Sequence, residues 1–103
     1  MIFMQIATLH TANKFTVTIT GRIDAKTAPE IEKTVLSMPD EVKALDFDFK
    51  NVVYISSAGL RMLITATQEM DRRGGSMKIF NANDEILEIF EVTGFTEFLP
   101  IEY

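Results

Sequence analysis

The chain has 103 residues, 47% hydrophobic and 24% charged, which suits one globular domain with a modest core. Its net charge of −5, from 15 acidic and 10 basic residues, disfavours direct nucleic-acid binding, because phosphate contacts need a basic surface. It has no cysteine, so it forms no disulfides and has no thiolate chemistry. It has no apolar run near the roughly 20 residues of a membrane helix, and its N-terminus lacks a secretory-signal pattern. We therefore expect a cytoplasmic protein without membrane insertion.

Alternation of apolar and polar residues predicts two strands at the start of the chain, around residues 2–6 and 15–19. Between them, Thr11-Ala12-Asn13-Lys14 is typical of a hairpin turn, so the two strands should be antiparallel neighbours. The alternating apolar residues are Ile2, Met4, Ile6, Phe15, Val17 and Ile19.

A loop and a helix are predicted next, the loop covering residues 21–26. Thr27 followed three residues later by Glu30 is a capping-box signature, and Pro29 is tolerated in a first helical turn. The inward face of this helix is predicted to hold Ile31, Val35 and Met38, before Pro39-Asp40 ends it.

The middle of the chain predicts a strand over residues 44–49, in which Asp46 and Asp48 alternate with core residues and are expected on a solvated face. An apolar run, residues 52–55, then leads into two serines. The remaining expectations are a helix from Gly59 ended by Gly74-Gly75, a strand over residues 77–80, a helix capped by Asn83 and ended at Gly94, and a terminal strand near residues 98–101.

The order β-β-α-β-α-β-α predicts an α/β fold with right-handed crossovers and a mixed, mostly parallel sheet of four to five strands with three main helices. In such sheets, functional residues collect in the loops after the strands' carboxyl ends. Three loops qualify here, over residues 21–24, 50–59 and 81–83. Asp24 and Ser57 are therefore expected to lie close together.

The serine pair Ser56-Ser57 has two interpretations. A serine at a helix N-terminus can cap the helix through its hydroxyl. It can also carry a phosphate, which the unpaired N–H groups and the helix dipole help to stabilise. Composition and spacing favour neither interpretation.

Catalysis is disfavoured by the same residues. A Gly-x-Ser-x-Gly nucleophile elbow would need glycine where Ile55 stands, and the only histidine, His10, is expected far from the serines, beside the hairpin turn. The chain lacks a phosphate-binding loop motif. Its carboxylates are expected on the solvated faces of strands and helices rather than in a metal site. We therefore expect no enzyme, no metal site and no cofactor.

Several motifs occur in a fixed order along nearly the whole chain. In that order they are Gly21-Arg22-Ile23-Asp24, Thr27-Ala28-Pro29-Glu30, Phe47-Asp48-Phe49-Lys50 and Tyr54-Ile55-Ser56-Ser57-Ala58-Gly59-Leu60. On these motifs the chain resembles the STAS domain family, in particular the bacterial anti-sigma factor antagonists, with residues 1–103 as one such domain.

The resemblance implies a regulatory cycle. An anti-sigma factor that is a serine kinase would bind the unphosphorylated chain, phosphorylate Ser57 (or, alternatively, Ser56) and release it, so that sigma-factor-dependent transcription is regulated. A serine phosphatase would reverse the modification. The partner-binding surface is then expected to comprise Asp24, Ser56, Ser57, Ala58, Gly59 and Arg61.

Two departures from the family pattern leave another interpretation open. Ser56 stands where the family usually has Asp, and Ala58 where it has Ser or Thr. The alternative is a STAS adaptor without a phosphorylation cycle, or a structural subunit of a larger lipid-transport or signalling assembly.

Overall fold

The computed structural model describes residues 4–103. Its elements in chain order are β1 (Gln5–Thr11), β2 (Lys14–Ile23), α1 (Ala28–Leu36), β3 (Ala44–Ile55), α2 (Ser57–Arg72), β4 (Ser76–Phe80), α3 (Asp84–Val92) and a short 3-10 turn, η1 (Phe95–Glu97). This order confirms the predicted β-β-α-β-α-β-α arrangement of an α/β domain.

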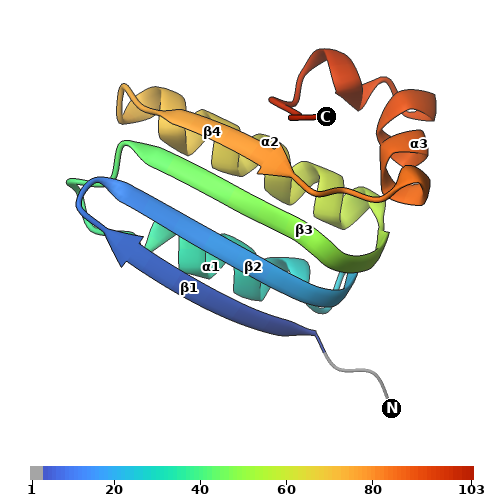
Figure 1. The fold of residues 1–103 in the computed structure, drawn as a ribbon, viewed down its shortest axis with the longest axis horizontal. Coiled ribbons are helices and arrows are strands. Elements are labelled where there is room, and N and C mark those ends of the chain that lie inside the picture. The colour runs from blue at the N-terminus through green and yellow to red at the C-terminus, as the bar shows by residue number, and fades with distance from the viewer. Residues whose placement is uncertain (1–3) are drawn as a thin grey trace.

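The four strands form one sheet in the order β1-β2-β3-β4. β1 pairs antiparallel with β2, and the other two pairs are parallel. Helices α1 and α2 lie together on one face of the sheet, whereas α3 lies beyond the carboxyl end of β4 (Figure 1). The carboxyl ends of β2 and β3 therefore meet at one edge of the sheet, where the chain turns into α1 and α2.

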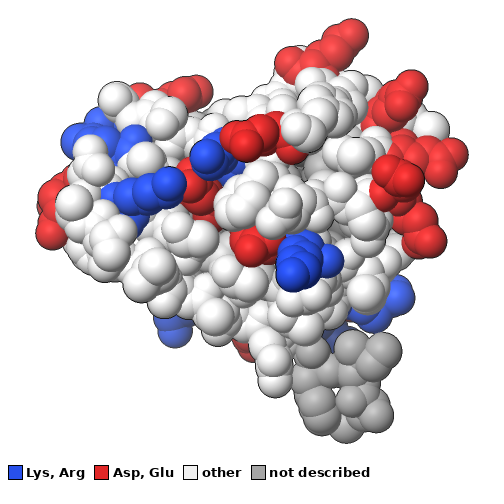
Figure 2. Space-filling model, in the orientation of Figure 1, with Lys and Arg blue, Asp and Glu red and all other residues white. Residues whose placement is uncertain are grey.

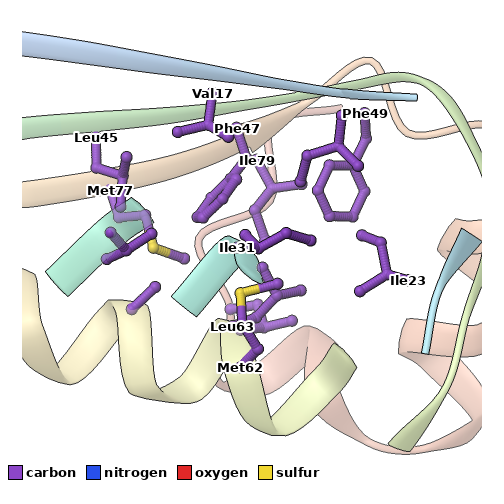
Figure 3. Close-up of a cluster of buried hydrophobic side chains, with 14 of the residues drawn as sticks. Val17, Ile23, Ile31, Leu45, Phe47, Phe49, Met62, Leu63, Met77 and Ile79 are labelled. Carbon is purple, nitrogen blue, oxygen red and sulfur yellow. The ribbon is translucent and has the colours of Figure 1, made fainter. Parts of the chain in front are cut away.

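The core lies between the sheet and the two helices (Figure 3). Inward residues of the strands pack against Ile31 of α1 and Leu63 of α2, and both side chains are fully buried. The largest buried side chains contributed by the strands are Phe47, Phe49, Ile19, Ile23, Leu45, Ile55 and Ile79. This burial is the main source of stability, at about 1.5–3 kcal/mol for each large apolar side chain.

The predicted hairpin is confirmed, with Thr11 paired to Lys14 across a two-residue turn. Ala12 in this turn has a positive φ of 52°, a conformation that tight hairpin turns require. Ile2, expected in the first strand, lies outside the described residues.

β2 and β3 are longer than the sequence predicts. β2 continues through residues 21–23, which were expected in a loop, and β3 runs without a break from Ala44 to Ile55. Two register shifts make this possible, the first between the pairs Thr18–Asp48 and Thr20–Asn51. Such bulges accommodate extra residues and change which side chains point inward. The helix α2 begins at Ser57, two residues before the predicted start at Gly59.

The predicted capping box at the start of α1 is wrong. Thr27 is the N-cap residue, but its side chain makes no capping hydrogen bond. Its hydroxyl instead donates to the carbonyl of Arg22 (2.8 Å) and accepts the N–H of Asp24 (2.9 Å). The helix ends at Leu36, so Met38 is buried just beyond it.

The caps predicted for α2 and α3 are confirmed. Asn83 accepts the N–H of Ile86 at 2.9 Å, and Gly94, with φ 79°, follows the end of α3. Gly74, with φ 69°, follows the end of α2. The possible terminal strand is reduced to one bridge, between Ile101 and Ile79.

The solvated position predicted for Asp46 is also wrong. This residue alternates with the core residues Leu45 and Phe47, so it lies on the sheet face away from α1 and α2, which is the face that Figure 2 views. Its side chain is nevertheless only 8% exposed. The Lys14 ammonium lies 2.9 Å from the carboxylate, and the Lys78 ammonium lies 3.9 Å from it. Two flanking lysines thus cover a carboxylate that alternation alone places in water.

Candidate functional site

The turn between β3 and α2 gives the two serines different positions. Ser56 is the N-cap residue in an extended conformation, and its side-chain oxygen accepts the N–H of Gly59 at 3.4 Å. Its carbonyl accepts the first helical N–H, that of Leu60, at 3.0 Å. Ser57 is the first residue of the helix and is exposed. The capping role therefore falls to Ser56, whereas Ser57 is exposed and its side chain makes no hydrogen bond within the described residues.

Gly59 explains why the turn lies so close to the sheet. A Cβ atom at this position would be 2.6 Å from Cγ1 of Ile55 and 2.8 Å from Cγ2 of Ile23. Contacts this short do not occur in folded proteins without a shift of the neighbours. Only glycine lets the first turn of α2 rest directly on the ends of β2 and β3, which fixes where the serines project.

Asp24 lies beside this turn, as expected from the topology. The backbone N–H of Ser56 donates to the carbonyl of Ile23 at 2.8 Å, and Ile23 pairs with Ile55 in the sheet. The residue after Ile23 therefore borders the residues after Ile55. The structure thus brings Asp24 and Ser57 to the same edge of the sheet although 33 positions separate them, as their numbers show.

The carboxylate of Asp24 is held as an anion. Its Oδ1 accepts the N–H of Lys26 at 3.0 Å and that of Thr27 at 3.2 Å. The hydrogen bond from Lys26, followed by those from Thr27, lowers the pKa of Asp24 below its ordinary value. A fixed negative charge therefore stands in the loop that borders the serine turn.

Ala58 and Arg61 line a shallow hollow of about 290 Å³ between α1 and α2. Met62 completes the α2 wall, and Glu32 brings a carboxylate from α1. The other lining residues are Ala25, Ala28 and Pro29. Small side chains thus leave a depression next to Ser57, with one acidic and one basic residue in its walls.

Two exposed apolar residues border the turn. Val53 is 53% and Tyr54 37% exposed, although both belong to the apolar run of residues 52–55. The guanidinium of Arg22 lies 4.3 Å from the centre of the Tyr54 ring, a cation–π contact between β2 and β3. The signal for this contact is the register pair Arg22–Tyr54, which becomes visible only when the bulges are known.

His10 is remote from the serines, as predicted. It pairs with Phe15 near the hairpin, and its ring nitrogen contacts the carbonyl of Ala12 at 2.9 Å. Because β2 and β3 are parallel, the hairpin end of β2 is opposite to the end that precedes Ser57. The sole histidine of the chain is therefore not placed to act as a base for this serine.

Within residues 4–103, no group of three or more His, Asp or Glu side chains is arranged to hold a metal ion. Over the same range, none of the helices is both long and apolar enough to span a membrane.

The fold and this turn define an α/β domain whose candidate site is an exposed serine at the start of a helix. The sequence model of the STAS domain matches residues 5–103, so the chain belongs to the STAS domain family.

Known relatives and solved structures agree with this membership. The chain is 27% identical over 89 residues to an anti-sigma-B factor antagonist of Bacillus subtilis, an alignment that covers 86% of this chain and 82% of the relative. The fold is similar to that of an anti-sigma factor antagonist from Mycobacterium paratuberculosis, with a TM-score of 0.82 and 21% identity over 96% of this chain and 85% of that one. It is also similar to the phosphorylated form of the Bacillus cell fate determinant SpoIIAA, with a TM-score of 0.72 and 14% identity over 98% and 92% of the two chains.

Proposed function

We propose that this chain is a cytoplasmic anti-sigma factor antagonist in which residues 1–103 act as one STAS domain. Unphosphorylated, it binds an anti-sigma factor that is also a serine kinase, and phosphorylation at Ser57 releases it. Its work is reversible binding rather than catalysis. The observation that carries the proposal is the division of roles in the turn, with Ser56 engaged in capping and Ser57 exposed.

The proposed modification is a phosphoryl transfer. The kinase moves the γ-phosphoryl group of ATP to Oγ of Ser57, whose hydroxyl proton is lost as the new O–P bond forms, and ADP leaves. A serine phosphatase then hydrolyses that O–P bond with water and returns the hydroxyl and inorganic phosphate. The relative SpoIIAA, solved in a phosphorylated form, supports this class of modification by likeness.

The charge of the phosphate supplies the physical reason for release. It adds about −1.5 to −2 charge at pH 7. The first turn of α2 tolerates that charge, because its N–H groups and the helix dipole favour anions, so the domain stays folded. Asp24 already makes the surface acidic. A partner that presents a carboxylate to Ser57 is therefore repelled after phosphorylation.

A second candidate is an adaptor or structural STAS subunit without a phosphorylation cycle. It is favoured by Ser56, which replaces the family's usual Asp. Ser and Asp are equally good N-caps, so the helix start is preserved while a carboxylate beside the acceptor hydroxyl is lost. Kinase recognition, rather than folding, is what this replacement changes.

The test is binding to an anti-sigma kinase from the same genome, measured by calorimetry. We expect Ser57→Asp to weaken binding at least about tenfold, about 1.4 kcal/mol, and Ser57→Ala to bind within about twofold of wild type. Ser76→Asp is the matched control, because Ser76 is exposed at the start of β4, at the opposite end of the parallel strands. A Ser57→Asp variant that binds as tightly as wild type would contradict the phosphorylation switch.

A further inference from the structure

Arg61 differs from the other three arginines of the chain in its contacts. Arg22 stacks on Tyr54, and Arg72 and Arg73 both pair with Glu69. Within residues 4–103, the guanidinium of Arg61 makes no ion pair or hydrogen bond, and the residue is exposed. Arg61 also lines the hollow between α1 and α2, so within the described residues it places an unpaired cation beside the serine turn.

The position of Arg61 on α2 places this cation within reach of Ser57. The two residues are separated by four positions in one continuous helix, so they are neighbours on its surface, with Cβ atoms about 5–6 Å apart. Long side chains in helices lean back toward the N-terminus, over the residue four positions earlier. A guanidinium offers a planar pair of N–H donors that matches two phosphate oxygens.

We propose that Arg61 is the internal ligand of the phosphate on Ser57. This inference rests on the proposed phosphorylation and deepens it. In the unphosphorylated protein Arg61 is available to a carboxylate of the partner. After phosphorylation it pairs with the phosphate of its own helix. The modification then changes the docking surface twice, since it adds an anion and withdraws a cation.

Other charged groups also surround the turn and would act on the phosphate. They are Arg22 at the end of β2, Asp24 and Lys26 in the loop that follows, and Glu32 of α1. None of the four shares a helix face with Ser57, whereas Arg61 does. The test must therefore separate the effect of Arg61 on the phosphate from the effect of these other charged groups.

The direct readout is the second pKa of the phosphate, followed by phosphorus NMR. Phosphoserine is installed at position 57 during translation, so the measurement needs no kinase. A neighbouring cation favours the dianion and lowers this pKa. Removing it in Arg61→Gln should raise the phosphate pKa by about 0.3 unit, the amount that corresponds to a helical i,i+4 ion pair.

Two controls accompany this variant. Arg61→Lys keeps the charge and should give less than half of the rise. Arg72→Gln removes the same charge at the other end of α2, about 22 Å from Ser57, and should leave the pKa unchanged. At about 1 M salt, where charges are screened beyond about 3 Å, the difference between wild type and Arg61→Gln should shrink.

An unchanged pKa in Arg61→Gln, or an equal rise in Arg72→Gln, would overturn the assignment. Because the phosphate is installed directly, these outcomes are independent of whether an anti-sigma kinase recognises the chain. The calorimetric test described above can fail while Arg61 still binds the phosphate, and the reverse also holds.

Discussion

The backbone N–H of Ser56 donates to the carbonyl of Ile23 at 2.8 Å, which joins the turn before α2 to the strand end before α1. Through this bond the loop that carries Asp24 and the turn that carries Ser57 form one surface. Both loops are further fixed by local hydrogen bonds, at Thr27 and at Gly59. The site is thus built on a rigid support, and a change at Ser57 alters its charge rather than its shape.

The capping role of Ser56 predicts unequal effects of two alanine substitutions. Ser56→Ala removes the acceptor for the N–H of Gly59 and should lower the free energy of unfolding by about 0.5–1 kcal/mol, the lower part of the range for lost caps. The low figure follows from the 3.4 Å length of this bond. Ser57→Ala should change the free energy by less than about 0.5 kcal/mol. Urea unfolding of both variants measures the two free energies of unfolding. An equal loss of stability in both variants would contradict the division of roles between the two serines.

Restoring the family's acidic residue is a related test. Ser56→Asp keeps an N-cap oxygen and adds a negative charge at the helix N-terminus, so it should be at least as stable as wild type. It should also be phosphorylated faster by anti-sigma kinases whose own antagonists carry Asp at this position. The initial rate of phosphate incorporation measures this effect, and a rate no higher than that of wild type would show that Ser56 does not limit kinase recognition.

The tight contact at Gly59 predicts that even a methyl group is costly. In an exposed helix, Gly→Ala is stabilising by up to about 1 kcal/mol. At Gly59 the added carbon meets Ile55 and Ile23 at 2.6 and 2.8 Å, so Gly59→Ala should instead lose about 1–3 kcal/mol through overpacking. Thermal unfolding shows directly whether Gly59→Ala is less or more stable than wild type. A variant more stable than wild type would contradict the close approach of α2 to the sheet.

Glu69 predicts part of the acid sensitivity of the fold. Hydrogen bonds from Arg72 and then Arg73 lower its pKa from 4.5 to about 2. Arg73 also donates to the carbonyls of Met38 and Pro39, which ties α2 to the segment after α1. A carboxyl whose pKa is lower in the folded state than in the unfolded state stabilises the folded state. This contribution is complete at pH values above the pKa that the carboxyl has in the unfolded state. This stabilisation is therefore complete above about pH 4.5 and is lost as the pH falls toward 2.

Glu69→Gln should accordingly cost about 1–2 kcal/mol at pH 7, after allowance for screening of the exposed Arg72, and much less near pH 2.5. Glu88→Gln, on the exposed side of α3, is the matched control and should show no such pH dependence. Urea midpoints at the two pH values test this. A cost that stays constant between them would mean that the charge of Glu69 does not contribute.

The order of elements was predictable because each helix and strand carries its own local signal. Asn83, Gly74 and Gly94 end or begin helices for reasons that depend only on neighbouring residues, and all three positions are confirmed. The bulges were not predictable. Residues 50 and 51 are polar and indicate a break in the strand, whereas pairing of β3 with β2 continues the strand across them.

The sequence proposes the members of the candidate site but does not predict their geometry. Motif order selects Asp24 and the serine pair, and topology brings them together. Which serine caps the helix depends on where α2 begins, and the sequence pattern places this start two residues too late. The same dependence on pairing explains Asp46, because its covering residue Lys78 becomes a neighbour only through the β3–β4 register.

The most direct test of the central claim is the phosphorylation state of the protein taken from its native host. Intact-mass measurement followed by peptide mapping should find a fraction of molecules with one added phosphate, located on Ser57. The fraction should disappear in Ser57→Ala and persist in Ser56→Ala. Unmodified protein under every condition in which its anti-sigma factor is active, or a phosphate on Ser56 alone, would contradict the account.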